Sequence, residues 1–398
     1  MSNETITAPL GFSAGAAACG IKVEGKLDVG VLVADRPCAA AAVFTSNRFC
    51  GAPIVVGREH IRGGLLRAIV VNSGCSNVAT GERGIADARE MCRLTAEPLG
   101  VPAEQVLPSS TGLIGSFLPM DRVQRGIAEA LASRANTPEA GLAFAKAIMT
   151  TDTRHKQAIA RVKIGGANVT VAGCCKGSGM IAPNMATMLG YLTTDAGLEP
   201  AVLQRVLRAA VEPTFNRITV DECESTSDTV AMLASGALAN LASEAEIEKF
   251  AACVQEVCAD LAYQIVKDGE GATRVLEVVV TSAKTPEDAH TAARAIAVSP
   301  LVKTAVHGGD PNWGRIVQAL GATRVAYELM NVTVHLADML LFAKGAPAPQ
   351  LDTARLSEAM RQPHVTVRVD LGAGTAQDRV LTCDLSREYV AINADYST

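Results

Sequence analysis

Aromatic residues are scarce in this sequence of 398 residues: they make up 4% of the chain, and Trp313 is the single tryptophan. Lysine and arginine number 36 against 41 acidic residues, they form no basic run, and the net charge is −5. Nucleic-acid binders usually carry a clustered basic surface and aromatic side chains that stack on bases. The sequence therefore predicts no nucleic-acid partner.

Long apolar runs and export signals are missing too. No segment reaches the roughly 18 unbroken apolar residues that suggest a membrane-spanning helix. The segment from Met1 to Leu10 is polar and lacks the apolar centre of a signal peptide. We therefore expect a cytoplasmic protein without a membrane partner.

Several motifs that would indicate a metal or nucleotide site are absent. The 11 cysteines contain no C-x-x-C pair, and the six histidines contain no H-E-x-x-H. Neither a G-x-G-x-x-G loop after a strand nor a G-x-S-x-G elbow occurs. We expect reduced cysteines that act as small apolar residues, and no metal site.

What the chain does contain is an alternation of strand-like and helix-like segments, with 48% hydrophobic residues. β-branched runs and partial two-residue alternation predict strands at 68–73, 168–171, 275–281, 331–336, 365–371 and 379–385. Helical spacing, caps and first-turn prolines predict helices at 83–99, 121–135, 138–149, 199–211, 243–267 and 286–297. This order indicates an α/β or α+β class.

The domain organisation is read from composition. A weakly marked boundary near 282–285 separates a main body, residues 1–282, from a smaller C-terminal domain, residues 283–398. The segment Phe342–Pro349, with two prolines and a glycine, is typical of a linker.

The segment Lys176–Leu189 is the first candidate for chemistry. A glycine-rich turn with Lys176 leads through Pro183 into an apolar run, and Thr187 stands beside this turn. A threonine at a chain's N-terminus has its own amine as a nearby base, so an internal threonine would need cleavage before it. Its hydroxyl can attack the preceding carbonyl and form an ester that water hydrolyses. Local chemistry alone favours an ordinary strand threonine.

Three further segments are weaker candidates. Thr111-Gly112 follows a strand-like run and can offer a hydroxyl and a backbone N–H to an oxyanion, or simply form a tight turn. The glycines and the Asp-Pro pair in His307–Arg315 predict a turn. This turn could bind an anion, or it could be a structural turn anchored by Trp313. The acidic residues Asp221, Glu222 and Glu224, near Asp228, predict a capped, solvated turn rather than a cation site.

Together these segments resemble the ornithine acetyltransferase family, the bifunctional glutamate N-acetyltransferases. The resemblance covers nearly the whole chain. The matching segments are 16–22, 43–45, 71–74, 110–115, 148–152, 176–189, 192–196, 225–230, 268–271, 299–315 and 393–398.

The resemblance implies cleavage between Ala186 and Thr187, giving an α chain of 1–186 and a β chain of 187–398 that stay associated. The freed Thr187 would take the acetyl group of N2-acetylornithine and pass it to glutamate in a ping-pong reaction of arginine biosynthesis. The implied fold is a layered α/β/β/α arrangement like that of N-terminal nucleophile hydrolases, of the β-peptidyl aminopeptidase type.

The resemblance also assigns site residues. Thr111 and Gly112 match the oxyanion-hole pair, and the substrate-binding positions match Thr150, Lys176, Thr187, Glu270, Asn393 and Thr398. Lys176 suits a substrate carboxylate, and Glu270 suits the amine of ornithine. The family needs no cofactor, some members use acetyl-CoA as a co-substrate, and pairs of cleaved heterodimers would fit it.

Two alternatives stay open from the sequence. An N-terminal-threonine aminopeptidase or amidase would use the same nucleophile with water as the acceptor. A binding protein with an uncut chain would need no nucleophile. The loop Glu222-Cys223-Glu224 departs from the family's usual Gly-Asp turn and puts the local loop shape and the acceptor preference in doubt.

Overall fold

The computed structural model describes residues 4–23, 25–182 and 188–395, which form two compact units. The first unit extends to Asn216 and resumes over Glu224–Ile265, and the second combines Arg217–Cys223 with the chain from Val266 onward. The second unit thus begins before the boundary expected at 282, because the strand Val275–Ala283 belongs to its sheet.

An eight-stranded sheet is the framework of the first unit, with the order β4-β3-β2-β8-β7-β6-β5 and β1 paired to β2. The long strand β2 pairs with β3 through its first half and with β8 through its second half, and the register shifts between Val33 and Cys38. The strands are β1 (Phe12–Ala17), β2 (Val29–Phe44), β3 (Leu65–Cys75), β4 (Val106–Leu113), β5 (Lys156–Ile164), β6 (Ala167–Lys176), β7 (Leu189–Gly197) and β8 (Thr229–Asn240).

The two halves of this sheet face each other across one buried core. Ile69 and Val71 of β3 belong to the same apolar cluster as Leu189 and Tyr191 of β7, although β2 and β8 separate these strands within the sheet. Phe144 packs edge-on against Tyr191 in this core, with ring centroids 5.5 Å apart. Strands buried on both faces carry continuous apolar runs, as β3 does.

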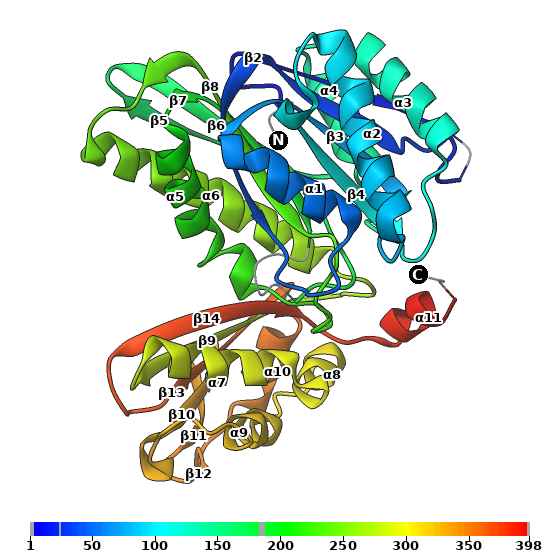
Figure 1. Cartoon of the computed structure of the whole chain (residues 1–398). Coiled ribbons are helices and arrows are strands. Elements are labelled where there is room, and N and C mark those ends of the chain that lie inside the picture. The colour runs from blue at the N-terminus through cyan, green and yellow to red at the C-terminus, as the bar shows by residue number, and fades with distance from the viewer. Residues whose placement is uncertain (1–3, 24, 183–187, 396–398) are drawn as a thin grey trace. The chain divides into compact units, whose positions relative to one another are not determined.

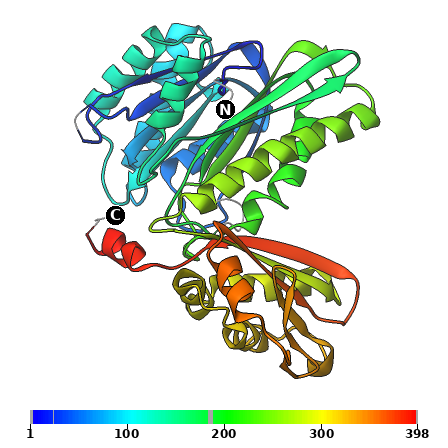
Figure 2. The ribbon, with the colours of Figure 1, turned by 180° about the vertical axis from the view of Figure 1, so that it is seen from behind.

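Helices cover the outer faces of both halves (Figures 1 and 2). α1, α2 and α3 share a buried cluster with β2, β3 and β4, whereas α6 packs Val257 and Leu261 against Gly173 of β6. The arrangement is therefore the expected α/β/β/α layering. The helices of this unit are α1 (Ala52–His60), α2 (Gly81–Leu99), α3 (Met120–Ala132), α4 (Pro138–Ala147), α5 (Pro200–Val211) and α6 (Glu244–Lys267).

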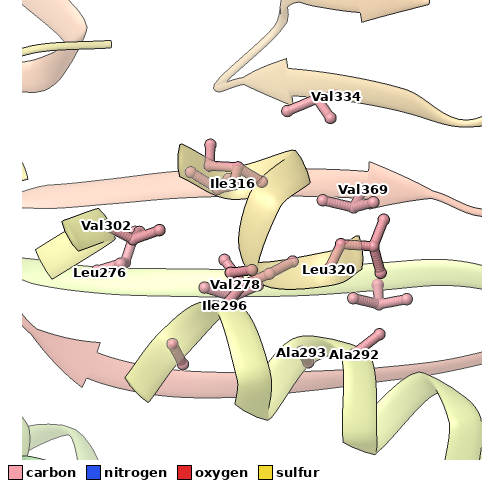
Figure 3. Packing of buried hydrophobic residues seen from close by; sticks show 14 of the residues in the cluster. Leu276, Val278, Ala292, Ala293, Ile296, Val302, Ile316, Leu320, Val334 and Val369 are labelled. Carbon is pink, nitrogen blue, oxygen red and sulfur yellow. The ribbon is translucent and has the colours of Figure 1, made fainter. Parts of the chain in front are cut away.

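The second unit contains a six-stranded sheet with the order β12-β11-β10-β13-β9-β14. Its core joins Leu276 and Val278 of the interior strand β9 to Ile296 of α7 and Leu320 of α9 (Figure 3). Its elements are β9 (Val275–Ala283), α7 (Pro286–Val298), α8 (Pro300–Gly308), α9 (Trp313–Gly321), β10 (Thr333–Leu336), β11 (Met339–Ala343), β12 (Ala346–Pro347), α10 (Thr353–Met360), β13 (His364–Asp370), β14 (Ala376–Cys383) and α11 (Arg387–Asp395).

All twelve predicted helices and strands are present, with ends that shift by up to a few residues. Two helices show why: Thr137 and Thr285 cap α4 and α7 by accepting a hydrogen bond from Ala140 N and Asp288 N, and a proline follows each cap. The predicted linker Phe342–Pro349 is wrong. It contains part of β11 and all of β12, which pair as a hairpin, because Lys344 and Gly345 both adopt positive φ in the turn.

The eleven cysteines are all free thiols, as expected, and eight of them are buried. Within the described ranges, no helix has the length and apolar character needed to cross a membrane.

Candidate functional site

Lys176 and Thr111 meet at one end of the first-unit sheet. Lys176 is the last residue of β6 and Thr111 lies on β4, in the opposite half of the sheet. The Lys176 Nζ is 3.5 Å from the Thr111 hydroxyl oxygen, and each of the two residues is only 9% exposed. The register of the sheet places Lys176 opposite Leu189, two positions after Thr187. A cation and a hydroxyl donor are thus adjacent to the start of β7.

Gly112 occupies a position that no other residue fits. Its φ is +129°, and a Cβ atom there would lie 2.4 Å from the carbonyl carbon of Gly74 and 2.6 Å from the nitrogen of Cys75. The β3–β4 register shifts beside it, between Gly74 and Cys75. Bulges of this kind often re-aim groups next to active sites. The close packing explains the Thr-Gly pair that the sequence singled out.

A buried polar network supports this turn. The Ser110 hydroxyl donates to the side-chain Oδ1 of Asn72 over 2.6 Å, and the side-chain Nδ2 of Asn72 donates to the backbone oxygen of Cys75 over 2.8 Å. Asn72 and Ser110 are buried, so both bonds are formed away from water. Satisfied buried polar groups rigidify a site. The network therefore fixes the backbone that carries Thr111 and Gly112.

Thr150 is connected to the Lys176 turn through Asp152. The Asp152 carboxylate accepts a hydrogen bond from Thr150 N over 2.9 Å and one from Gly177 N over 2.7 Å. The Thr151 and Ser178 hydroxyls are 2.7 Å apart and join the same two segments. The structure thus brings Thr111, Thr150 and the Lys176 turn together in the first unit.

Asp152 forms a buried ion pair with Lys156. The Lys156 Nζ is 2.6 Å from the Asp152 carboxylate, and both side chains are 0% exposed. Burial alone would raise the pKa of this carboxyl, but the Lys156 and Lys176 ammonium groups and the bonds from Lys156 and Gly177 lower it to about 2. Asp152 is therefore a carboxylate at neutral pH.

Asp228 is a second buried carboxyl near the start of β7, whereas Asp221, Glu222 and Glu224 of the predicted solvated turn are partly or fully exposed. Asp228 is 2% exposed, and Thr229 N donates to Met188 O over 2.9 Å. Burial raises the pKa of Asp228 well above its usual range, although Ser225, Lys176 and the Met188 backbone act in the opposite direction. Burial results because Asp228 directly precedes β8, an interior strand of the sheet.

Three predicted site residues, Ala186, Thr187 and Thr398, lie outside the described part of the chain. The described residues resume at Met188, so the cleavage between Ala186 and Thr187 stays a prediction.

Glu270 and Asn393 meet within the second unit. The Asn393 side-chain amide donates to the Glu270 carboxylate over 2.9 Å. Gly271 makes this contact possible: its φ is +68°, and a Cβ there would lie 2.5 Å from Tyr389 N. The Glu270 turn is thus packed against the first turn of α11, and Ser386 also donates to Gly271 O over 2.6 Å.

The segment His307–Arg315 forms the turn between α8 and α9. Asn312 caps α9 by accepting from Arg315 N over 3.2 Å, and Trp313 stacks on Phe342 with centroids 5.3 Å apart. His307 Nδ1 is 2.7 Å from the Asp384 carboxylate. These contacts support the structural interpretation of this turn.

Sequence reasoning missed Asp152, Lys156 and the buried state of Asp228. A weak signal existed for the first two, because Asp152 lies two positions after Thr150 and Lys156 starts an alternating strand on its buried side. Among the described residues, no three side chains of histidine, cysteine, aspartate or glutamate are grouped as metal ligands would be.

Comparison with known proteins shows similarity along the whole chain. A sequence model described as the ArgJ family matches residues 13–398. The arginine biosynthesis bifunctional protein ArgJ of Dehalococcoides mccartyi is 45% identical over 399 residues, covering 99% of this chain and 97% of that protein. The protein of the same name from Symbiobacterium thermophilum is 46% identical over 398 residues, covering 99% and 98%.

Solved structures give a further comparison. A chain described as ornithine acetyltransferase complexed with ornithine, from Mycobacterium tuberculosis, is 38% identical and has a TM-score of 0.44. The match covers 47% of this chain and 98% of the Mycobacterium tuberculosis chain. A chain of arginine biosynthesis bifunctional protein ArgJ from Bacillus halodurans is 42% identical with a TM-score of 0.45, covering 47% and 96%.

Proposed function

Because this chain belongs to the ArgJ family, we propose that it transfers the acetyl group of N2-acetylornithine to glutamate through an ester on Thr187. The chain is an acetyltransferase of arginine biosynthesis. The observation that carries the proposal is the meeting of Thr111, Gly112 and Lys176 at the end of the sheet where β7 begins, directly after the Ala186-Thr187-Met188 motif.

Cleavage comes first in the proposed sequence of steps. The Thr187 hydroxyl oxygen attacks the Ala186 carbonyl carbon, the peptide C–N bond breaks, and the amine of Thr187 becomes free. Water then hydrolyses the resulting ester and restores the hydroxyl. The products are a chain of 1–186 and a chain of 187–398, the second of which starts with a nucleophile and its own base.

Acetyl transfer then follows two matched steps. The Thr187 oxygen bonds to the acetyl carbon of acetylornithine while its proton moves to the Thr187 amine. The C–N bond to ornithine breaks, and the ornithine nitrogen takes up that proton. The amine of glutamate next attacks the ester carbon, the C–O bond to Thr187 breaks, and the proton lost by the glutamate nitrogen returns to the Thr187 oxygen. Both tetrahedral intermediates carry an oxyanion, for which Thr111 and the Gly112 N–H are the proposed donors.

The charged residues suit the two amino acids. Lys176, with its ammonium beside Thr111, is the proposed partner of the substrate carboxylate. Glu270, whose carboxylate is oriented by Asn393, is the proposed partner of the ornithine side-chain amine. Thr150 and Thr398 complete the proposed substrate-binding set.

Thr187→Ala is the direct test, with Thr304→Ala on the exposed surface of α8 as the matched control. We expect two fragments on denaturing electrophoresis from the native chain and the control, and one uncut, inactive chain from the Thr187 variant. Full acetyl transfer by an uncut chain would contradict the proposal. Rapid release of acetate from acetylornithine without glutamate would favour a hydrolase instead.

Thr111→Val tests the oxyanion role, because valine keeps the shape of threonine and removes the hydroxyl. Loss of one oxyanion donor typically lowers kcat by about 100- to 1,000-fold. We expect a loss in this range with an unchanged thermal midpoint. An unchanged kcat would remove Thr111 from the mechanism.

Two further parts of the proposal concern donors and assembly. The curated relatives carry the word bifunctional in their names, which supports acetyl-CoA as a second acetyl donor for glutamate. The proposed transfer steps need no bound cofactor. Incubation of the purified enzyme with acetyl-CoA and glutamate tests this. We also propose that two cleaved heterodimers associate in the cytoplasm, for which light scattering should give twice the mass of the chain.

A further inference from the structure

Asp152 has three hydrogen-bond donors on two segments that lie far apart in the sequence. Its two carboxylate oxygens accept from Thr150 N over 2.9 Å, from Gly177 N over 2.7 Å and from Lys156 Nζ over 2.6 Å. Thr150 is a proposed substrate-binding residue, and Gly177 directly follows Lys176, which is another. One carboxylate thus joins the backbones that carry both residues.

The buried Asp152–Lys156 ion pair is better explained by the backbone groups that it holds in place than by a contribution to folding stability. Taking two charges out of water costs several kcal/mol for each ion, and apolar replacements of similar volume are often equally or more stable. The Asp152 and Lys156 side chains are both fully buried, so they carry this cost in full. What an apolar pair cannot supply is an acceptor for the two backbone N–H groups of Thr150 and Gly177.

Lys156 leaves the charge of Lys176 available. Lys156 is the counter-ion that contacts Asp152, whereas the Lys176 Nζ is beside the Thr111 hydroxyl. The three charges sum to one positive charge at the end of β6. A substrate carboxylate would meet this positive charge at Lys176.

We propose that Asp152 is a positioning residue that fixes Thr150 and Lys176 at the spacing required for substrate binding, with Lys156 as its buried counter-ion. This inference rests on the proposed function, because it takes Thr150 and Lys176 as the groups that bind the substrates. It adds to that function a pair of residues that touches no substrate and controls the affinity for both.

The decisive variant is the double substitution Asp152→Leu with Lys156→Met, studied in the full chain. It replaces the pair by apolar side chains of similar size, so folding and cleavage are retained while both backbone N–H groups lose their acceptor. We expect the KM for acetylornithine and for glutamate to rise by about 10- to 100-fold, as for lost hydrogen bonds to a charged acceptor. We expect kcat to fall by less than about threefold, because the nucleophile and Thr111 are untouched.

Asp152→Glu is the second variant. It keeps the charge and the partner Lys156 but moves the acceptor oxygens by one methylene, so KM should rise while the thermal midpoint stays close to that of the native chain. Unchanged KM values in either folded variant would overturn the inference. A purely structural role would change the midpoint and leave KM as it was.

A measurement on the native chain completes the test. The amide hydrogens of Thr150 and Gly177 should exchange with solvent as slowly as those of the neighbouring sheet, and rapid exchange of both would overturn the inference even if no variant folds. Assays of the native enzyme are done first. If the native enzyme transfers no acetyl group from acetylornithine, the proposed function fails; if it does and the variants bind normally, only the role of Asp152 fails.

Discussion

Asp152 and Asp228 are buried carboxyl groups of the same compact unit, and their surroundings differ in one respect. Asp152 has an ammonium group at 2.6 Å and two backbone N–H donors. One carboxylate oxygen of Asp228 is buried without a hydrogen-bond partner in the part of the chain that the structure describes. The pKa of Asp152 accordingly falls to about 2, whereas burial raises that of Asp228.

Burial alone therefore does not decide the charge of a carboxyl group, because the number and kind of its partners also shift its pKa. Near the start of β7, the partners of Asp152 thus favour its ionised form, whereas burial favours the protonated form of Asp228. The first suits a backbone clamp, since an anion accepts several hydrogen bonds. The second can donate a hydrogen bond, which an anion cannot do.

Removal of the cation is the harshest test of this difference. Lys156→Met leaves Asp152 buried without its contacting counter-ion, and breaking a buried pair in this way typically costs about 3–5 kcal/mol. We expect a loss of this size in the free energy of unfolding, measured with denaturant. The double variant Asp152→Leu with Lys156→Met is the control and should regain part of the loss, because no charge is left unpaired although two backbone N–H groups lose their acceptor. Equal stability of the single and double variants would show that the pair is not coupled.

Paired asparagine substitutions compare the two carboxyls directly. Asp152→Asn removes a charge that Lys156 needs and should cost about 2–3 kcal/mol of unfolding free energy, within the range for hydrogen bonds to charged groups. Burial raises the pKa of Asp228, and Asp228→Asn puts a neutral group of the same shape in its place, so at pH 4 we expect a change below about 1 kcal/mol. Urea unfolding measures Asp152→Asn at pH 7 and Asp228→Asn at pH 4. A larger loss for Asp228→Asn at pH 4 would contradict the raised pKa.

The sequence predicts most of the helices and many of the strands, but little of what distinguishes the surroundings of Asp152 from those of Asp228. Periodicity and caps place α2, α6 and α7 because these signals are local. β2 was missed because its second half, from Ala39 to Ala42, is a run of alanines that has no strand preference until it pairs with β8. The Asp152 clamp requires β5 and β6 to pair, with Lys156 opposite Cys175, and no local pattern reports that register.

The same limit explains the outcome for the acidic loop. Asp221, Glu222, Glu224 and Asp228 have similar polar neighbours in the sequence, and only the entry of Asp228 into the sheet distinguishes it. Local patterns singled out Thr111, Gly112 and Lys176 as candidates, whereas only the family resemblance pointed to Glu270 and Asn393. Their partners, Asn72 and Ser110 among them, follow from tertiary contacts.

The pH dependence of stability should have opposite signs for the two carboxyls. The folded pKa of Asp152, about 2, lies below its ordinary value near 3.9, so its contribution is complete above about pH 4 and is lost as the pH falls toward 2. The folded pKa of Asp228 is raised, so its contribution is complete below about pH 4 and is lost as the pH rises through the folded pKa. Asp228→Asn should therefore gain stability relative to the native chain as the pH rises from about 4 through the folded pKa of Asp228, and equal slopes in thermal unfolding would contradict the assignment.

The smallest expected effect on the free energy of unfolding comes from an exposed ion pair. Arg205 of α5 and Glu244 of α6 are 2.9 Å apart, close to the Asp152–Lys156 distance, but their side chains are 56% and 62% exposed. Water already solvates both charges, so pairing adds little, and exposed pairs typically contribute about 0–1 kcal/mol. Arg205→Gln should change the unfolding free energy by less than about 1 kcal/mol, and added salt should abolish the difference. A loss similar to that of Lys156→Met would show that distance, rather than burial, governs the strength of ion pairs in this protein.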